Sequence, residues 1–232
     1  MKKVAFCPAD ANNLKYFEML KNSLRKFHSE EELPLLRFDN ETGDPLFFYR
    51  AVPYLAKKLM EQGYDCVIKL DADQIITGKL DHIWEGDFDI AVVQNSNPRE
   101  LKNYPVTVWD INPLDYVNCG FVVMKNKAFI DHWWNLCNSY HFNNYQMKEQ
   151  DLLNILVFYG NYNVKFLDKS NKFHGLASKG YWNQIELRDN KLVLSQNQEW
   201  PQDSDKEIVC IHVAGGNNPA KMKLGPYFKP EV

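Results

Sequence analysis

A run of β-forming residues that ends in two closely spaced carboxylates constrains this chain more than any other feature. Residues Cys66–Leu70 are mostly apolar, which predicts a buried strand, and Asp71 and Asp73 follow at once. In an extended segment, residues two apart point to the same side, so both carboxylates can face one ion beyond the end of the strand. That end of a strand is the usual ligand site of an α/β sheet.

The paired carboxylates repel each other, and a divalent cation with oxygen ligands would relieve the repulsion while holding the phosphates of a substrate. Asp is also frequent in surface turns and helix caps, which is the simpler interpretation of an isolated Asp-x-Asp. Ile75 and Ile76 follow the pair, however, so apolar residues flank it on both sides, where an unpaired charge is costly. The flanking sequence therefore favours a metal site.

Composition excludes several classes of protein. The 232 residues are most simply one domain with a sizeable core, and a net charge of −3 does not suggest nucleic-acid binding. No stretch has the length of a membrane span, and the first apolar run is too short for a signal peptide. The five cysteines stand singly, as reduced thiols of cytosolic proteins do. We therefore expect a cytoplasmic protein without a transmembrane segment.

Strand and helix patterns alternate along the chain. Apolar segments predict strands at Lys3–Cys7, Leu35–Phe38, Cys66–Leu70, Ile90–Val93, Tyr116–Met124, Val164–Leu167 and Glu207–His212. Helical spacing predicts helices at Leu14–Phe27, Pro45–Met60, Phe129–Cys137 and Glu149–Tyr159, the second kinked or started by Pro53. Residues 168–200 show little regular pattern, and 95–113 read as a flap over the site. The alternation predicts an α/β fold with a mostly parallel central sheet covered on both faces.

Polar residues stand at the ends of several predicted strands. Asp10 and Asn12 follow the first strand, where they either contact a ligand or cap the next helix. Asn118-x-Gly120 fits either a backbone that passes close to a ligand or a β-bulge. His212 ends the last strand, where a partly buried structural histidine is the simpler interpretation.

The helix that begins at Glu149 carries acids in its first turn, which the helix dipole favours without any function. Gln150 gains nothing from that effect. The loop after the last strand is rich in glycine and then carries lysines, a composition that suits phosphate binding.

Taken together and in this order, these segments resemble the metal-dependent glycosyltransferases of family 8, which include glycogenin and the lipopolysaccharide galactosyltransferases. The resemblance spans most of the chain. It rests on six motifs, Asp10-x-Asn12, Tyr49-Arg50, Leu-Asp71-Ala-Asp73, Asn118-x-Gly120, Gln150-Asp151-x-Leu-Asn154 and His212-x-x-Gly215. It implies a single catalytic domain of the glycosyltransferase-A fold over 1–232, with a nucleotide-binding part over about 1–125 and an acceptor-binding, closing part over about 126–232.

The resemblance also implies roles for individual residues. Asp71, Asp73 and His212 would hold Mn²⁺ or Mg²⁺, which would bridge the two phosphates of a UDP-sugar donor. Glu149 would hold hydroxyls of the donor sugar, and Gln150 would lie near the reactive face of the anomeric carbon. The further donor-binding residues that it implies are Pro8, Asp10, Asn12, Arg50, Ala72, Asn118, Cys119, Gly120, Gly215 and Lys221.

The implied reaction moves the sugar to a hydroxyl of a carbohydrate or another acceptor. A neutral amide at Gln150 supports an oxocarbenium-like centre without the nucleophilicity of a carboxylate, which favours retention of configuration. Asp151 is an alternative nucleophile. The chain departs from the family pattern at Ala11, where a second acid is usual, and at Glu149, where aspartate is usual. Its lysines also come late after Gly215, which leaves the diphosphate-binding lysine open.

Two other functions fit part of the pattern. A sugar-nucleotide pyrophosphorylase would need a glycine-rich, basic loop after the first strand, and Cys7–Asn12 contains no Gly, Lys or Arg. A non-catalytic module that binds a nucleotide sugar or glycan would not need Asp71, Asp73, His212 and Gln150 together. The complete set therefore favours a transferase.

Overall fold

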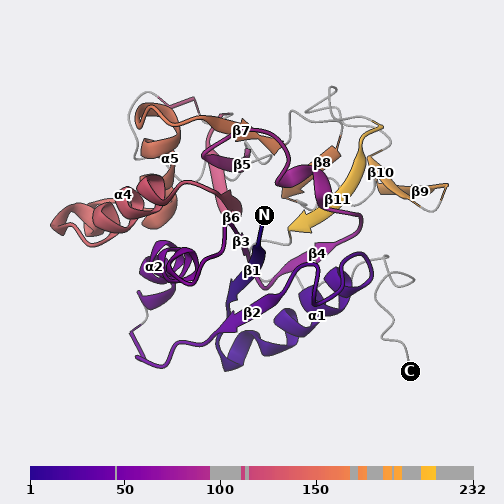
Figure 1. Ribbon diagram of the computed structural model, residues 1–232, viewed down its shortest axis with the longest axis horizontal. Helices are drawn as coiled ribbons and strands as arrows, with labels where there is room; N and C mark the ends of the chain where they lie inside the picture. Colours follow the sequence, from indigo (N-terminus) through magenta and orange to yellow (C-terminus); the bar gives the residue numbers. More distant parts are fainter. Residues whose placement is uncertain are drawn as a thin grey trace.

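The central sheet of the computed structural model has six strands in the order β2-β1-β3-β6-β5-β7 (Figure 1). The structure describes residues 1–44, 46–94, 111–112, 115–167, 172–176, 185–189, 191–194 and 205–212. The strands are β1 (Lys3–Pro8), β2 (Leu35–Phe38), β3 (Cys66–Leu70), β5 (Ile90–Gln94), β6 (Val117–Met124) and β7 (Val164–Phe166). β6 runs antiparallel to both of its neighbours, whereas the other pairs are parallel. The predicted mostly parallel sheet is confirmed.

Each face of this sheet has its own hydrophobic core, because side chains alternate between the faces along a strand. Helices α2 (Phe47–Glu61), α4 (Lys127–Cys137) and α5 (Glu149–Tyr159) cover one face, and α1 (Leu14–Arg25) covers the other (Figure 1). Val67 of β3 packs in the first core, and Ile68 and Leu70 pack in the second.

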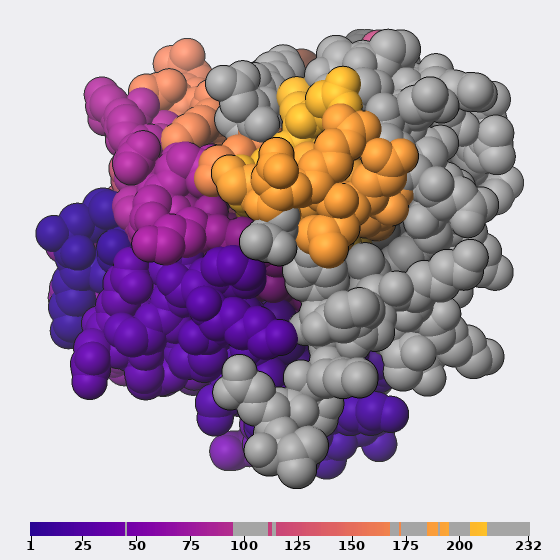
Figure 2. Space-filling view, turned by 90° about the vertical axis from the view of Figure 1, so that its right-hand side faces the viewer, coloured from indigo at the N-terminus to yellow at the C-terminus, as the bar shows by residue number. Residues whose placement is uncertain are grey.

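A second sheet brings the C-terminal strands to the end of β3. Its order is β4 (Gln74–Ile76), β11 (Glu207–His212), β10 (Lys191–Leu194) and β9 (Ile185–Arg188), and β8 (Lys172–Leu176) pairs with β11. β4 follows Asp73 directly and pairs antiparallel with β11, which sets Gln74 opposite His212. In Figure 2 the orange surface of the strands between residues 172 and 194 adjoins the violet and magenta surface of the N-terminal half.

Most predicted elements are confirmed, with ends shifted by a few residues. α2 begins before Pro53, which lies inside the helix. The prediction of an irregular segment over residues 168–200 is wrong, because β8, β9 and β10 lie there. These strands are short, and β9 is mostly exposed, so no long apolar run marks them. The predicted flap at 95–113 lies almost entirely outside the described residues.

Two expectations about the class of protein can also be compared with the fold. All five cysteines are buried free thiols, as expected for a chain without a disulfide framework. Within the described ranges, every helix is too short or too polar to cross a membrane.

Candidate active site

Three side chains from two strand ends form the candidate metal site. Asp71 and Asp73 follow β3, and His212 ends β11. His212 Nε2 lies 3.0 Å from Asp73 Oδ1 and 3.4 Å from Asp71 Oδ2. One ligand atom from each residue lies within 4.8 Å of the other two. Two carboxylates and one imidazole are a donor set that fits a divalent cation such as Mn²⁺, so these residues suit the predicted cation.

A turn, and not an extended strand, brings the two carboxylates together. β3 ends at Leu70, and the Gln74 N–H donates to the Asp71 carbonyl at 3.1 Å, which closes a four-residue turn. The expectation that strand alternation aligns Asp71 and Asp73 is therefore wrong in mechanism. The turn nevertheless directs both carboxylates at His212.

Neighbouring charges shift the pKa values of His212 and Asp71. Burial lowers the pKa of His212, but the hydrogen bond to Asp73 and the charges of both aspartates raise it more, so the net pKa lies above its ordinary value. Burial raises the pKa of Asp71, but the charges of Lys69 and His212 lower it more, so the net pKa lies below its ordinary value. Because a cation binds the unprotonated ring, the raised pKa of His212 makes cation binding more favourable at higher pH.

Gly120 lets the backbone of β6 approach these ligands closely. A Cβ at this position would lie 2.2 Å from His212 Cε1 and 2.7 Å from Asp71 Oδ2. The pairing register of β5 and β6 shifts here, with Val92 opposite Val122 and Val93 opposite Asn118. The bulge interpretation of Asn118-x-Gly120 is thus confirmed, whereas the approach of this backbone to a ligand stays a prediction.

Lys69 is a member of the cluster that the sequence analysis missed. Its side chain, 3% exposed, pairs with Asp71 Oδ1 and donates to the Cys119 carbonyl at 2.8 Å. A signal was present, because a lysine inside an apolar strand needs a partner, and Asp71 stands two residues later. Lys69 therefore occupies one oxygen of Asp71, while the other faces His212.

The first turn of α5 lies against the same part of β6. Gln150 Oε1 accepts from the Cys119 N–H at 3.0 Å and from Asn118 Nδ2 at 3.2 Å. The Cys119 thiol donates to Glu149 Oε1 at 3.3 Å. Glu149 Oε2 is buried and has no hydrogen-bond partner in the part of the chain that the structure describes. Burial raises the Glu149 pKa to about 8, although Lys69 and Cys119 act to lower it.

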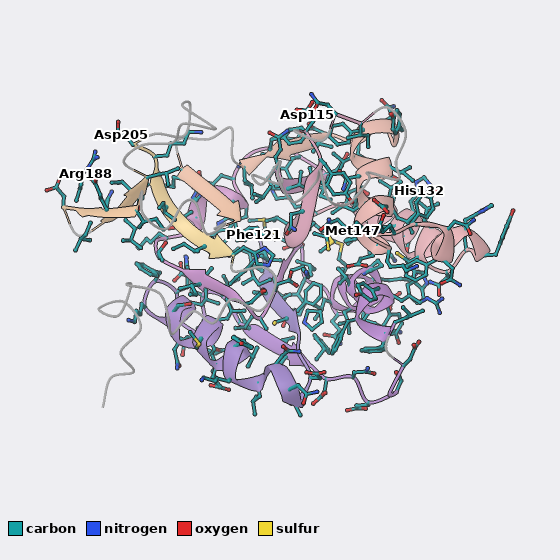
Figure 3. The ribbon with its side chains drawn as sticks, turned by 180° about the vertical axis from the view of Figure 1, so that it is seen from behind. Asp115, Phe121, His132, Met147, Arg188 and Asp205 are labelled. Carbon is teal, nitrogen blue, oxygen red and sulfur yellow. The ribbon has the colours of Figure 1, made fainter. Side chains whose placement is uncertain are left out.

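Asp151 is held by the protein on both carboxylate oxygens. Oδ1 accepts from the Tyr116 hydroxyl at 2.8 Å, and Oδ2 accepts from the Met147 N–H at 2.9 Å (Met147 is labelled in Figure 3). Asn154, one turn later, bonds to both the N–H and the carbonyl of Val117. Asp151 is fully buried, and this geometry favours a structural role for it over that of a nucleophile.

Only solved structures are similar to this chain in the three comparisons. No family model and no curated protein matches the chain. Among solved structures, the bifunctional glycosyltransferase WbbM is 14% identical over 98% of this chain with a TM-score of 0.62, and the chain spans 49% of WbbM. The galactosyltransferase LgtC, solved with donor and acceptor sugar analogs, is 16% identical with a TM-score of 0.62, over 97% of this chain and 93% of LgtC. This chain has the glycosyltransferase-A fold.

Two further structures support that assignment. A glycosyltransferase involved in the glycosylation of the major capsid of PBCV-1 is 11% identical with a TM-score of 0.59, over 97% of this chain and 98% of its own. An active-site variant of LgtC, in which glutamate replaces a glutamine, is 14% identical with a TM-score of 0.61, over 97% of this chain and 93% of its own. At these identities the likeness establishes the fold, and it confirms the resemblance to family 8 at that level.

Within the glycosyltransferase-A fold, the first loop lies beside the metal cluster. Phe6 of β1 is opposite Lys69 of β3, so Pro8 at the end of β1 lies near Asp71. Asp10 caps the short helix η1 (Ala11–Asn13), and its Oδ1 accepts from the backbone and side-chain N–H of Asn13 at 3.0 and 2.8 Å. The capping interpretation is therefore confirmed for Asp10 alone, whereas contact of Asp10 and the exposed Asn12 with a nucleotide stays a prediction.

The remaining predicted donor residues lie in several places. Ala72 is in the turn between the two aspartates and packs on the core beneath α1. Arg50 is on α2 with its guanidinium 4.8 Å from the centre of the Phe142 ring, and its Nε lacks a hydrogen-bond partner within the described ranges. Gly215 and Lys221 lie outside the described residues.

A second group of possible metal ligands consists of His28, Glu32 and Asp81. The His28 ring accepts the Leu80 N–H at Nε2, 2.9 Å, and its Nδ1 lies 3.3 Å from Glu32 Oε1. Because both ring nitrogens face protein groups, this group is best explained as a link between the segment after α1 and the helix η2 (Asp81–Ile83).

Proposed function

We propose that this chain transfers a sugar from a UDP-sugar to an acceptor hydroxyl, with Mn²⁺ or Mg²⁺ as cofactor and with retention of the anomeric configuration. The observation that carries the proposal is the convergence of Asp71, Asp73 and His212 at the end of β3 in a glycosyltransferase-A fold. The bound cation would supply charge stabilisation for the leaving diphosphate.

The residues of α5 would handle the donor sugar. Glu149 has a pKa raised to about 8 and one buried oxygen without a hydrogen-bond partner among the described residues, so at neutral pH its carboxyl group can both donate to and accept from a sugar hydroxyl. Gln150 is held on β6 by Cys119 and Asn118, which positions its amide rigidly. LgtC has a glutamine in its active site, which supports a place for Gln150 in the active site proposed for this chain.

The route by which configuration would be retained depends on whether the site offers a nucleophile. Both Asp151 oxygens accept hydrogen bonds from the protein, so this carboxylate is poorly placed to attack the anomeric carbon. A covalent intermediate on Asp151 is thus disfavoured, so for the proposed retention we infer that the acceptor hydroxyl attacks on the face that the diphosphate leaves. Product configuration, measured by NMR of the anomeric proton, tests this step, and an inverted product would exclude it.

Calorimetric titration of UDP tests the donor site. Wild-type protein with Mn²⁺ should bind UDP, and EDTA or the Asp73→Ala substitution should abolish most of that binding. If UDP binds equally well in EDTA, the metal-centred proposal fails. If UDP binding requires the metal, release of free sugar from a panel of UDP-sugars would identify the donor. A screen of compounds with free hydroxyl groups would then identify the acceptor.

The same protein samples distinguish the proposed transferase from two alternative functions. A pyrophosphorylase would form UDP-sugar from UTP and a sugar phosphate, and the first loop carries no basic residue to hold a triphosphate. A binding module would bind UDP-sugar without turnover. The single-domain organisation and the cytoplasmic location stay predictions.

A further inference from the structure

Gln74 is a buried amide residue next to the candidate metal cluster. It is the first residue of β4 and only 1% exposed. Neither its Oε1 nor its Nε2 has a hydrogen-bond partner among the residues that the structure describes. Buried amide groups are nearly always hydrogen-bonded, because an unsatisfied one keeps the full cost of its lost hydration. Such a group calls for an explanation.

The pairing of β4 with β11 indicates where this amide points. Gln74 is directly opposite His212 in the antiparallel register. Opposite residues of an antiparallel pair place their side chains on the same face, with Cβ atoms about 5 Å apart. The His212 imidazole on that face contacts Asp73 and Asp71. The Gln74 amide therefore lies on the cation side of β4.

The backbone of Gln74 also belongs to the turn that carries the ligands. Its N–H donates to the Asp71 carbonyl at 3.1 Å, and Asp73 precedes it in sequence. An amide oxygen is a suitable partner for a hard cation or for a water bound to it, and the amide N–H groups can donate to a phosphate oxygen.

We propose that Gln74 is an additional residue of the cation site, whose amide is satisfied only when the divalent cation and its water or diphosphate ligands are bound. This inference rests on the proposed metal dependence. It gives a role to a buried polar side chain on a strand whose next residues, Ile75 and Ile76, are apolar and buried. Among the described residues the Gln74 amide has no hydrogen-bond partner, and the bound cation and its ligands would supply one.

The test is Gln74→Met, which removes the amide and keeps the length of the side chain. Without ligand the variant should melt at or above the wild-type temperature, because no unsatisfied polar group is left. Its Mn²⁺ affinity, measured from the EPR signal of free Mn²⁺, should fall about tenfold, as for other residues that support metal ligands. Ile75→Val is the matched control, since Ile75 faces away from the cation on the same strand, and its Mn²⁺ affinity should equal that of wild type.

The outcomes separate this inference from the proposed function. If wild type does not bind Mn²⁺, the metal-dependent function fails and this inference with it. If wild type binds Mn²⁺ and folded Gln74→Met binds it equally well, only the role of Gln74 is overturned. Should Gln74→Met fail to fold, Gln74→Glu keeps an oxygen in place and adds charge, so tighter Mn²⁺ binding than wild type supports the role and unchanged or weaker binding overturns it.

Discussion

The imidazole of His212 lies 3.0 Å from the carboxylate of Asp73, although the two residues stand far apart in the sequence. The contact exists because β11 pairs with β4, the strand that directly follows Asp73. It joins the protonation of one proposed metal ligand to the charge of another.

Binding of Mn²⁺ should therefore tighten as the pH rises. Burial lowers the His212 pKa, but the hydrogen bond to Asp73 and the charge of Asp73 raise it by more. The imidazole therefore keeps its proton to a higher pH than an ordinary histidine does. A metal ion binds the unprotonated ring, so proton loss favours the complex. Calorimetric titration of Mn²⁺ across a pH series, in buffers of different ionisation enthalpy, would give the number of protons released on binding. Affinity that does not change with pH would contradict the predicted ligation by His212.

Gly120→Ala should disrupt the metal cluster. The added Cβ would lie 2.2 Å from His212 Cε1, so the imidazole or β6 must shift, at a cost of about 1–3 kcal/mol. Mn²⁺ affinity should fall together with thermal stability. Gly78→Ala is the control, because its Cβ would meet Val209 Cγ1 at 2.9 Å, away from the cluster. It should lower stability and leave Mn²⁺ affinity unchanged.

Lys69→Met should destabilise the unliganded protein. It leaves Asp71 and the Cys119 carbonyl without the ammonium group that both contact. The loss should be about 2 kcal/mol, below that for a fully buried pair because Asp71 is 35% exposed. Mn²⁺ should then raise the melting temperature more than in wild type, since the cation no longer meets a neighbouring positive charge.

The control for that experiment is Lys125→Met. Lys125 donates to the Gly86 carbonyl at 2.8 Å and lies over the Phe88 ring, so its substitution also removes a lysine hydrogen bond without touching Asp71. A Mn²⁺ response in Lys69→Met equal to that of wild type and of Lys125→Met would argue against charge compensation at Asp71.

Glu149→Gln should gain stability relative to wild type as the pH rises. Burial raises the folded-state pKa of Glu149 from 4.5 to about 8, so the unfolded chain loses this proton first. The stability that the protonated carboxyl contributes is therefore complete below pH 4.5 and is lost as the pH rises to about 8. Chemical denaturation at several pH values would show the difference between the two proteins growing across this window. A constant difference would mean that Glu149 ionises normally.

Local sequence patterns determined the elements that stand beside the site. The apolar run that ends at Leu70 predicts β3, and the apolar spacing after Asp151 predicts α5, because both signals come from neighbouring residues on one face. The short spacing of Asp71 and Asp73 likewise predicts a shared ligand. These features are local, so they can be read without knowing how the chain folds back.

The tertiary structure decided which residues meet. His212 could be suspected from its position at a strand end, but its contact with Asp73 requires β11 to pair with β4. The position of Gln74 beside the cluster and the tight fit at Gly120 become apparent only when the strands have been paired. Pairing between distant strands depends on the whole set of packing partners and not on the local pattern of either strand, which is why the sequence alone predicts the ligands but not the surroundings that hold them.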